Sequence, residues 1–206
     1  MPGRRSSKKA TWFMSEQTWW YVSRSTGIVA AVLLLMSLVL GMLMSTRLLR
    51  SVDRPAWLLA MHRWTSGLAV FATAGHIAAL VADSYVEFGP AEILVPFASE
   101  WQPTAVALGV IAMYLLAIVQ VTSLLMKKLP RKLWRAIHMA SYGATWLAVI
   151  HAGMAGTDVS NRVYRVVSLV VILAATSVAV VRVSGSGKRA PRERTRSQES
   201  TELTNA

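Results

Sequence analysis

The sequence predicts an all-α integral membrane protein, a bundle of about five transmembrane helices. Hydrophobic residues make up 54% of the 206 residues, and the mean hydropathy is +0.43. The apolar residues form long blocks with few charges, and lysine and arginine gather at the block ends and in both tails. A helix of about 20 apolar residues crosses the hydrocarbon core and satisfies its own backbone hydrogen bonds. This pattern is typical of a membrane bundle.

Five apolar blocks are long enough to span a bilayer: residues 26–46, 57–82, 104–126, 133–154 and 163–181. A basic and aromatic segment precedes them, and a polar, charged tail follows them. The composition of that tail is typical of disordered chain. We therefore expect an N-terminal segment over residues 1–25, one membrane domain over residues 26–183, and a disordered tail over residues 184–206.

The net charge of +12 comes from basic residues placed as in a membrane protein, rather than in a pattern typical of a nucleic-acid-binding surface. Basic residues fill the segments between the first and second blocks and between the third and fourth, whereas residues 83–102 contain four acidic residues and no Lys or Arg. Cytoplasmic loops carry excess positive charge. We expect residues 127–132 inside, residues 83–102 outside, and a multi-pass protein of the plasma or inner membrane whose partner is the lipid bilayer. That topology places the N-terminus outside, against four basic groups in residues 1–9.

The chain contains no cysteine, which excludes disulfides, thiolate metal sites and iron–sulfur clusters. No Ser-His-Asp arrangement and no pair of carboxylates is placed for hydrolysis. We therefore assign no catalytic residue, and any redox chemistry must use a bound cofactor.

All four histidines lie in the second and fourth blocks: His62 and His76 in one, His138 and His151 in the other. Ionisable residues within a membrane are costly and usually functional. The two blocks run parallel, so His62 and His138 lie near the cytoplasmic ends and His76 and His151 near the outer ends. The spacings of 14 and 13 residues correspond to roughly 21 and 20 Å of helix. The histidines therefore form two layers, each with one imidazole from each helix.

Two facing imidazoles suit six-coordinate haem iron, so we predict two b-type haems with these four histidines as axial ligands. A zinc or copper site needs three or four clustered donors, and each layer offers two. At about 100° per residue, a spacing of 13 misses the same helix face by roughly 140°. The fourth span must therefore kink, bulge near residues 141–143, or present its haems at different angles.

Other residues near the histidines have two interpretations. Arg63, Arg135 and Lys132 are placed to pair with propionates of the inner haem, and positive-inside anchoring explains them equally well. Three glycines either let a macrocycle approach or pack helices closely: Gly67, Gly75 and Gly143. Lipid or core packing explains three aromatic residues better than an electron route between haems: Trp64, Phe71 and Trp146.

Two segments resemble the haem helices of the ferric reductase-like transmembrane family. One is Met61–Gly67 followed by Gly75-His76-Ile77, and the other is Trp134–His138 followed by Tyr142 and His151. Arg24–Gly27 also resembles the bacterial members. The family includes eukaryotic ferric reductases, NADPH oxidases and the haem-bearing membrane subunit of bacterial methionine sulfoxide reductase systems. The resemblance covers roughly residues 20–180, and its specific part is the histidine spacing.

The resemblance implies that His62 pairs with His138 on an inner haem and His76 with His151 on an outer one. It implies an oxidoreductase component that passes electrons across the membrane. The donor would be a flavin reductase or quinol, and the acceptor ferric iron, oxygen or a partner oxidoreductase. Residues 184–206 hold no Gly-rich phosphate loop, so we expect flavin or quinone to come from a separate partner. Alternatives are a quinol-linked dihaem cytochrome of b561-like type and a non-catalytic scaffold or assembly factor that retains the fold.

Overall fold

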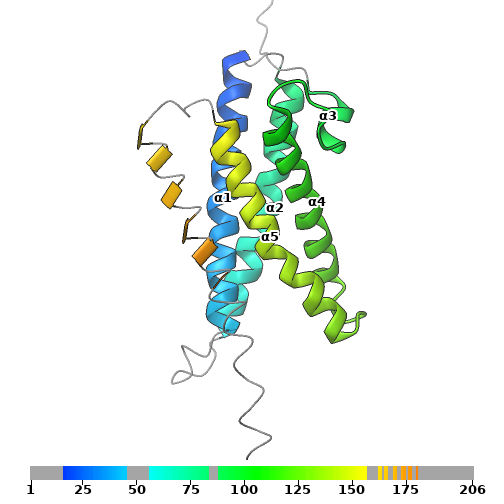
Figure 1. The fold of residues 1–206 in the computed structure, drawn as a ribbon. Helices are drawn as coiled ribbons and strands as arrows, with labels where there is room; N and C mark the ends of the chain where they lie inside the picture. Colours follow the sequence, from blue (N-terminus) through cyan, green and yellow to red (C-terminus); the bar gives the residue numbers. More distant parts are fainter. Residues whose placement is uncertain are drawn as a thin grey trace, which may run out of the picture.

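A computed structural model of the chain describes residues 16–45, 56–83 and 88–156, together with isolated residues between 162 and 180. Its helices are, in chain order, α1 (Glu16–Ser45), α2 (Ala56–Ala82), α3 (Pro90–Leu94), α4 (Pro103–Leu124) and α5 (Arg131–Ala155). The four long helices run alternately up and down, and short α3 lies at one end beside α4 (Figure 1). The described residues contain no strand. The predicted all-α membrane bundle is therefore confirmed.

Among the described residues, three helices are long and apolar enough to cross a membrane: Thr18–Ser45, Ala56–Ala82 and Pro103–Leu124. They correspond to the first three predicted spans. The fourth predicted span coincides with α5, whose 25 residues rise about 37 Å, enough to cross the hydrocarbon core. Its composition is more polar, because basic residues fill its first turns. The fifth predicted span and the tail lie outside the continuously described residues, as do residues 1–15.

Two segments differ from the sequence-based boundaries. Helix α1 begins at Glu16 rather than at residue 26, so the aromatic residues Trp19, Trp20 and Tyr21 belong to its first turns. A 30-residue helix is about 45 Å long, which exceeds the hydrocarbon thickness and leaves these aromatics at interfacial depth. The predicted outer loop 83–102 contains α3. The hydroxyl of Tyr114 on α4 donates to the carbonyl of Leu94 at 2.6 Å and fastens the end of α3.

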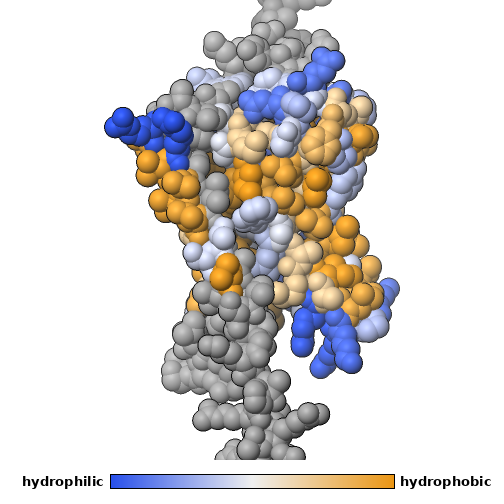
Figure 2. Space-filling view, in the orientation of Figure 1, coloured by the Kyte–Doolittle hydropathy of each residue, from blue (hydrophilic) through white to orange (hydrophobic). Residues whose placement is uncertain are grey.

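Small residues form the interior of the bundle. Helix α1 packs mainly on α2 and α4 mainly on α5, and α1 also contacts α5. The most buried side chains are alanines, including Ala69, Ala107 and Ala144, and no large side chain of the described residues is fully buried. Large apolar side chains such as Phe71, which is 79% exposed, project outward instead. Figure 2 shows the result, an apolar middle with hydrophilic ends. This distribution is typical of helices packed within lipid.

Helix α5 is α-helical from Arg131 to Ala155, so the described structure contains no bulge near residues 141–143. His138 and His151 consequently leave α5 in directions that differ by roughly 140°. The helix runs obliquely through the bundle, displaced toward α4 at its start and toward α1 at its end (Figure 1). The oblique course, rather than a break in the helix, accommodates the spacing of 13 residues.

Candidate cofactor site

The four histidines meet in two pairs between α2 and α5. The ring centroids of His62 and His138 lie 6.1 Å apart, with the ring planes at 74°. The ring centroids of His76 and His151 lie 6.4 Å apart, with the planes at 73°. The two pairs are thus nearly identical in separation and angle, although they lie about 21 Å apart along α2. The partners are those expected from the parallel course of the two helices.

Neighbouring helices orient three of the four rings through backbone carbonyls. His62 Nδ1 lies 3.0 Å from the Ser37 carbonyl, and His76 Nδ1 lies 2.7 Å from the Ser23 carbonyl. His151 Nδ1 lies 2.7 Å from the carbonyl of Ala105 on α4. A carbonyl only accepts hydrogen bonds, so Nδ1 must carry the proton and donate it. The hydrogen bond therefore fixes the tautomer, and Nε2 keeps a lone pair that can bind a metal ion.

A glycine one turn beyond each of these carbonyls makes room for the ring. A Cβ atom on Gly27 would lie 3.0 Å from His76 Nδ1, and one on Gly109 would lie 2.8 Å from His151 Nδ1. A Cβ atom on Gly41 would lie 3.4 Å from His62 Cε1. We call each carbonyl and its glycine a notch, namely Ser23–Gly27, Ser37–Gly41 and Ala105–Gly109. Each notch lets an imidazole approach the backbone of the neighbouring helix.

The notches were missed from the sequence, although α1 carries a signal for them. Ser-x-x-x-Gly occurs at residues 23–27 and again at 37–41, so its two copies are 14 residues apart. That repeat equals the spacing of His62 and His76. Two antiparallel helices with equal repeats present matching positions at two depths. The equality of the two spacings could therefore have identified the notch residues on α1.

His138 is held differently from the other three histidines. Its Nδ1 lies 3.3 Å from the hydroxyl of Ser123, and its ring stacks on Trp134 at 5.1 Å. Helix α4 ends at Leu124, and in the following turn the Met126 N–H approaches the Ser123 carbonyl at 3.4 Å. The position one turn after Ser123 is Lys127 instead of glycine. A hydroxyl both donates and accepts, so it does not fix the tautomer of His138.

A cavity of about 290 Å³ adjoins the outer histidine pair. Residues of all five helices line it, and its polar lining includes His76, His151 and Arg24. Large apolar side chains and the carboxylates of Asp83 and Glu92 also line it. Ten further lining residues are glycines and alanines on several helices: Gly27, Ala30, Ala31, Gly109, Ala112, Ala144, Ala148, Ala152, Ala155 and Gly156. A concave, mostly apolar site with a few convergent polar groups is typical of a cofactor pocket.

The remaining predicted residues lie at the periphery. The side chains of Arg63, Arg135 and Lys132 are exposed near the inner pair. Trp64 is 72% exposed, which agrees with lipid contact rather than with a route between the histidine layers. Gly67 is one of the glycines predicted to admit a macrocycle. Its own helix backbone and its chain neighbours aside, no atom of the described residues lies within 4 Å of a Cβ position there.

Two other predicted glycines face side chains of neighbouring helices. A Cβ atom on Gly75 would lie 3.7 Å from Thr26 Cγ2, and one on Gly143 would lie 4.0 Å from Leu115 Cδ1. Both are ordinary packing distances. Among the described residues no group of three or more His, Cys, Asp or Glu side chains comes together. The donor sets at this site are therefore pairs of imidazoles.

The comparison with known families decides the assignment. The family described as ferric reductase like transmembrane component matches residues 26–150. This chain belongs to that family. The matched residues include His62, His76 and His138, and His151 directly follows the end of the match. No curated protein and no solved structure matches the chain.

Proposed function

We propose that this ferric reductase-like protein carries electrons across a plasma or inner membrane through two bis-histidine b-type haems. A cytoplasmic-side flavin reductase or quinol supplies the electrons, and ferric iron, oxygen or a partner oxidoreductase accepts them outside. One observation carries the proposal: His62 faces His138 and His76 faces His151 with almost the same separation and angle. Two equal pairs at two depths suit a redox chain better than isolated structural histidines.

The ring separations fit a pair of axial ligands. Metal–imidazole bonds of about 2.0 Å, with about 1.2 Å from each nitrogen to its ring centre, separate two axial centroids by roughly 6.4 Å. The observed separations are 6.1 and 6.4 Å. In three rings the proton is on Nδ1, so the lone pair of Nε2 is available to coordinate iron. Distances and tautomers thus support haem ligation by these pairs.

The haem supplies one-electron chemistry, and the chain's own residues hold and shield it. The backbone carbonyls of α1 and α4 orient the imidazoles and raise their basicity as ligands. Small residues around the outer pair leave space for a flat group, and the surrounding apolar side chains exclude water. Arg63 and Arg135 are our candidates for pairing with inner-haem propionates, because both lie near the inner pair at the basic end of the bundle.

The first test is the haem content of the detergent-purified protein. We expect a low-spin b-type spectrum, reduction by dithionite, and two haems per chain by pyridine haemochrome. Colourless protein after expression with ample haem would contradict the proposal and favour the scaffold alternative. Stopped-flow reduction by a flavin reductase with NADH, compared with reduction by a quinol analogue, separates the two donors. Rapid reduction by quinol alone would identify quinol as the donor.

The second test addresses the pairing. Removing both ligands of one layer, as in His76→Ala/His151→Ala, should remove about half the haem, no more than either single change removes. Removing one ligand from each layer, as in His62→Ala/His76→Ala, should remove nearly all of it. The reason is that the layers are about 21 Å apart, so one iron cannot take ligands from both. Equal haem content in the two double variants would show that the pairing is wrong.

A further inference from the structure

Trp134 carries an unpaired polar atom beside the inner histidine pair. Its indole Nε1 is buried and has no hydrogen-bond partner within the part of the chain that the structure describes. Indole N–H only donates, so it needs an acceptor. Leaving such a donor buried and unpaired is unfavourable, and in native proteins it usually marks a missing water, ion or ligand. The position of Trp134 indicates which ligand.

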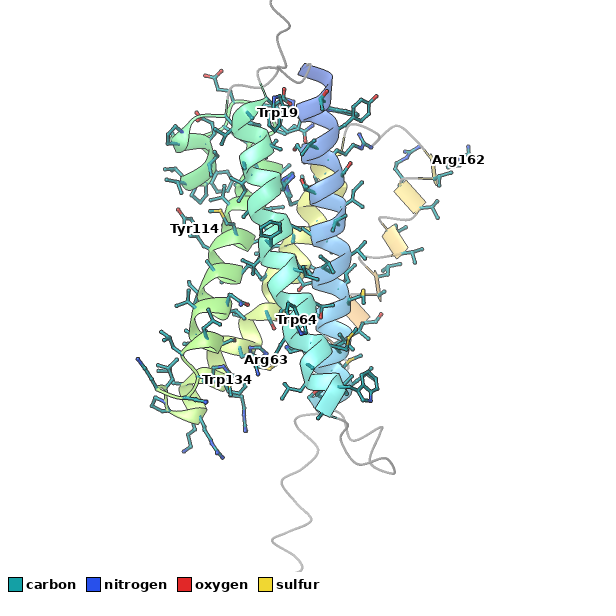
Figure 3. All side chains as sticks on the ribbon, turned by 180° about the vertical axis from the view of Figure 1, so that it is seen from behind. Trp19, Arg63, Trp64, Tyr114, Trp134 and Arg162 are labelled. Carbon is teal, nitrogen blue, oxygen red and sulfur yellow. The ribbon has the colours of Figure 1, made fainter. Side chains whose placement is uncertain are left out.

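Trp134 lies one helical turn before His138 on α5, on its cytoplasmic side. The two rings stack, with centroids 5.1 Å apart and planes at 24°, so the indole is held against the imidazole. Arg131, Lys132 and Arg135 surround it in the sequence of this turn. Figure 3 shows Trp134 and Arg63 at similar height near the basic end of the bundle. The unpaired donor is therefore held against His138 by stacking, in a helical turn that carries three basic residues.

We propose that the Trp134 N–H donates a hydrogen bond to a propionate carboxylate of the inner haem, an inference that rests on the proposed function. A haem bound between His62 and His138 carries its strong acceptors, the carboxylates, on one edge. The charged propionate edge of the haem is more stable when it points toward the basic end of the bundle than when it points toward the apolar middle. Trp134 lies on that side of His138. A charged acceptor also forms the stronger hydrogen bond, which suits a buried donor.

The matched variants are Trp134→Phe and Trp146→Phe. Phenylalanine keeps an aromatic ring against His138, but it removes the indole N–H together with part of the ring volume, a loss that the control Trp146→Phe shares. Trp146 lies on the same helix, and its N–H already donates to the Thr176 hydroxyl at 3.2 Å, so it controls for loss of an indole. We expect haem release from the inner site to apomyoglobin to accelerate roughly tenfold or more in Trp134→Phe, because a hydrogen bond to a charged group is lost. Trp146→Phe should release haem like the wild type.

Haem dimethyl ester identifies the acceptor. Reconstituted with this esterified cofactor, the wild type and Trp134→Phe should differ much less in the rate at which they release the inner haem, because the uncharged ester oxygens accept a weaker hydrogen bond. Trp134→His, which keeps a ring N–H, serves as a second variant if phenylalanine impairs folding, and it should retain part of the difference. The inference is overturned if Trp134→Phe releases natural haem like the wild type, or if the difference is as large with the ester as with natural haem. A wild-type protein without haem would overturn the proposed function as well, so the two failures are distinguishable.

Discussion

Replacing Gly109 by alanine should selectively weaken the outer haem site. The new Cβ atom would lie 2.8 Å from both Nδ1 and Cε1 of His151. Carbon atoms pack best at about 3.5–4.0 Å, so the imidazole must move by roughly 0.7 Å or more. The same ring is held by a 2.7 Å hydrogen bond to the Ala105 carbonyl, one turn away on α4. The movement therefore acts directly on a ligand that the notch had positioned.

The size of the effect follows from that hydrogen bond. A displacement of roughly 0.7 Å takes the Nδ1–O distance to about 3.4 Å, beyond the usual limit of about 3.2 Å. Loss of the bond alone costs about 0.5–1.5 kcal/mol, which is about 2–13-fold in affinity. Misplacement of the ligand adds to this cost, and loss of an outer-shell partner typically lowers metal-site affinity about 10–100-fold. We expect the outer haem of Gly109→Ala to bind about 10–100-fold more weakly, with the inner haem unchanged.

The assay is haem release to apomyoglobin, resolved into an outer and an inner phase. Gly27→Ala, with a Cβ contact of 3.0 Å, should behave like Gly109→Ala, and Gly41→Ala, at 3.4 Å, should have a smaller effect. Gly67→Ala is the matched control, because nothing lies within 4 Å of its Cβ position and alanine stabilises a helix interior by roughly 0.5–1 kcal/mol. The role of the notch would be refuted if Gly109→Ala released the outer haem at the wild-type rate. It would also be refuted if Gly67→Ala accelerated haem release as much as Gly109→Ala.

Three further predictions concern the ends of the bundle. Cysteine at exposed Glu100 should react with an impermeant reagent in intact cells and cysteine at exposed Lys128 should not, and the opposite result would reverse the topology. Ser123→Ala removes the hydroxyl beside His138 and should accelerate inner but not outer haem release, measured as above. Tyr114→Phe should loosen α3 by about 1 kcal/mol, seen as faster amide hydrogen exchange at its carboxyl end, and unchanged exchange would show that the bond is unimportant.

The bundle was predictable because lipid imposes strong constraints on sequence. Long apolar blocks and basic loops suffice to place α2 and α4 within a few residues. The histidine pairs were also accessible, because parallel helices with similar spacings place equivalent residues at similar depths. The extension of α1 to Glu16 was not predicted, since residues 1–25 were set apart as a basic and aromatic segment before the first span.

What the sequence could not supply is the lateral contact between helices. Gly67 and Gly109 are both glycines in apolar helices, yet one faces open space and the other faces an imidazole. The difference depends on the rotation of each helix, which periodicity does not fix when nearly every position is apolar. The exception at His138 likewise depends on where α4 ends, because the final turn determines which groups of Ser123 remain accessible.

The matched repeats on α1 and α2 constrain how these helices can change in length. The carbonyls of Ser23 and Ser37 and the rings of His76 and His62 are both 14 residues apart, in antiparallel register. Inserting one residue between the two notches would rotate one of them by about 100° and shift it by about 1.5 Å. Such an insertion would break the hydrogen bond between one histidine and its carbonyl on α1, unless α2 also gained a residue between His62 and His76. Relatives of this protein should therefore accept insertions and deletions in residues 46–55 and exclude unmatched ones within either repeat.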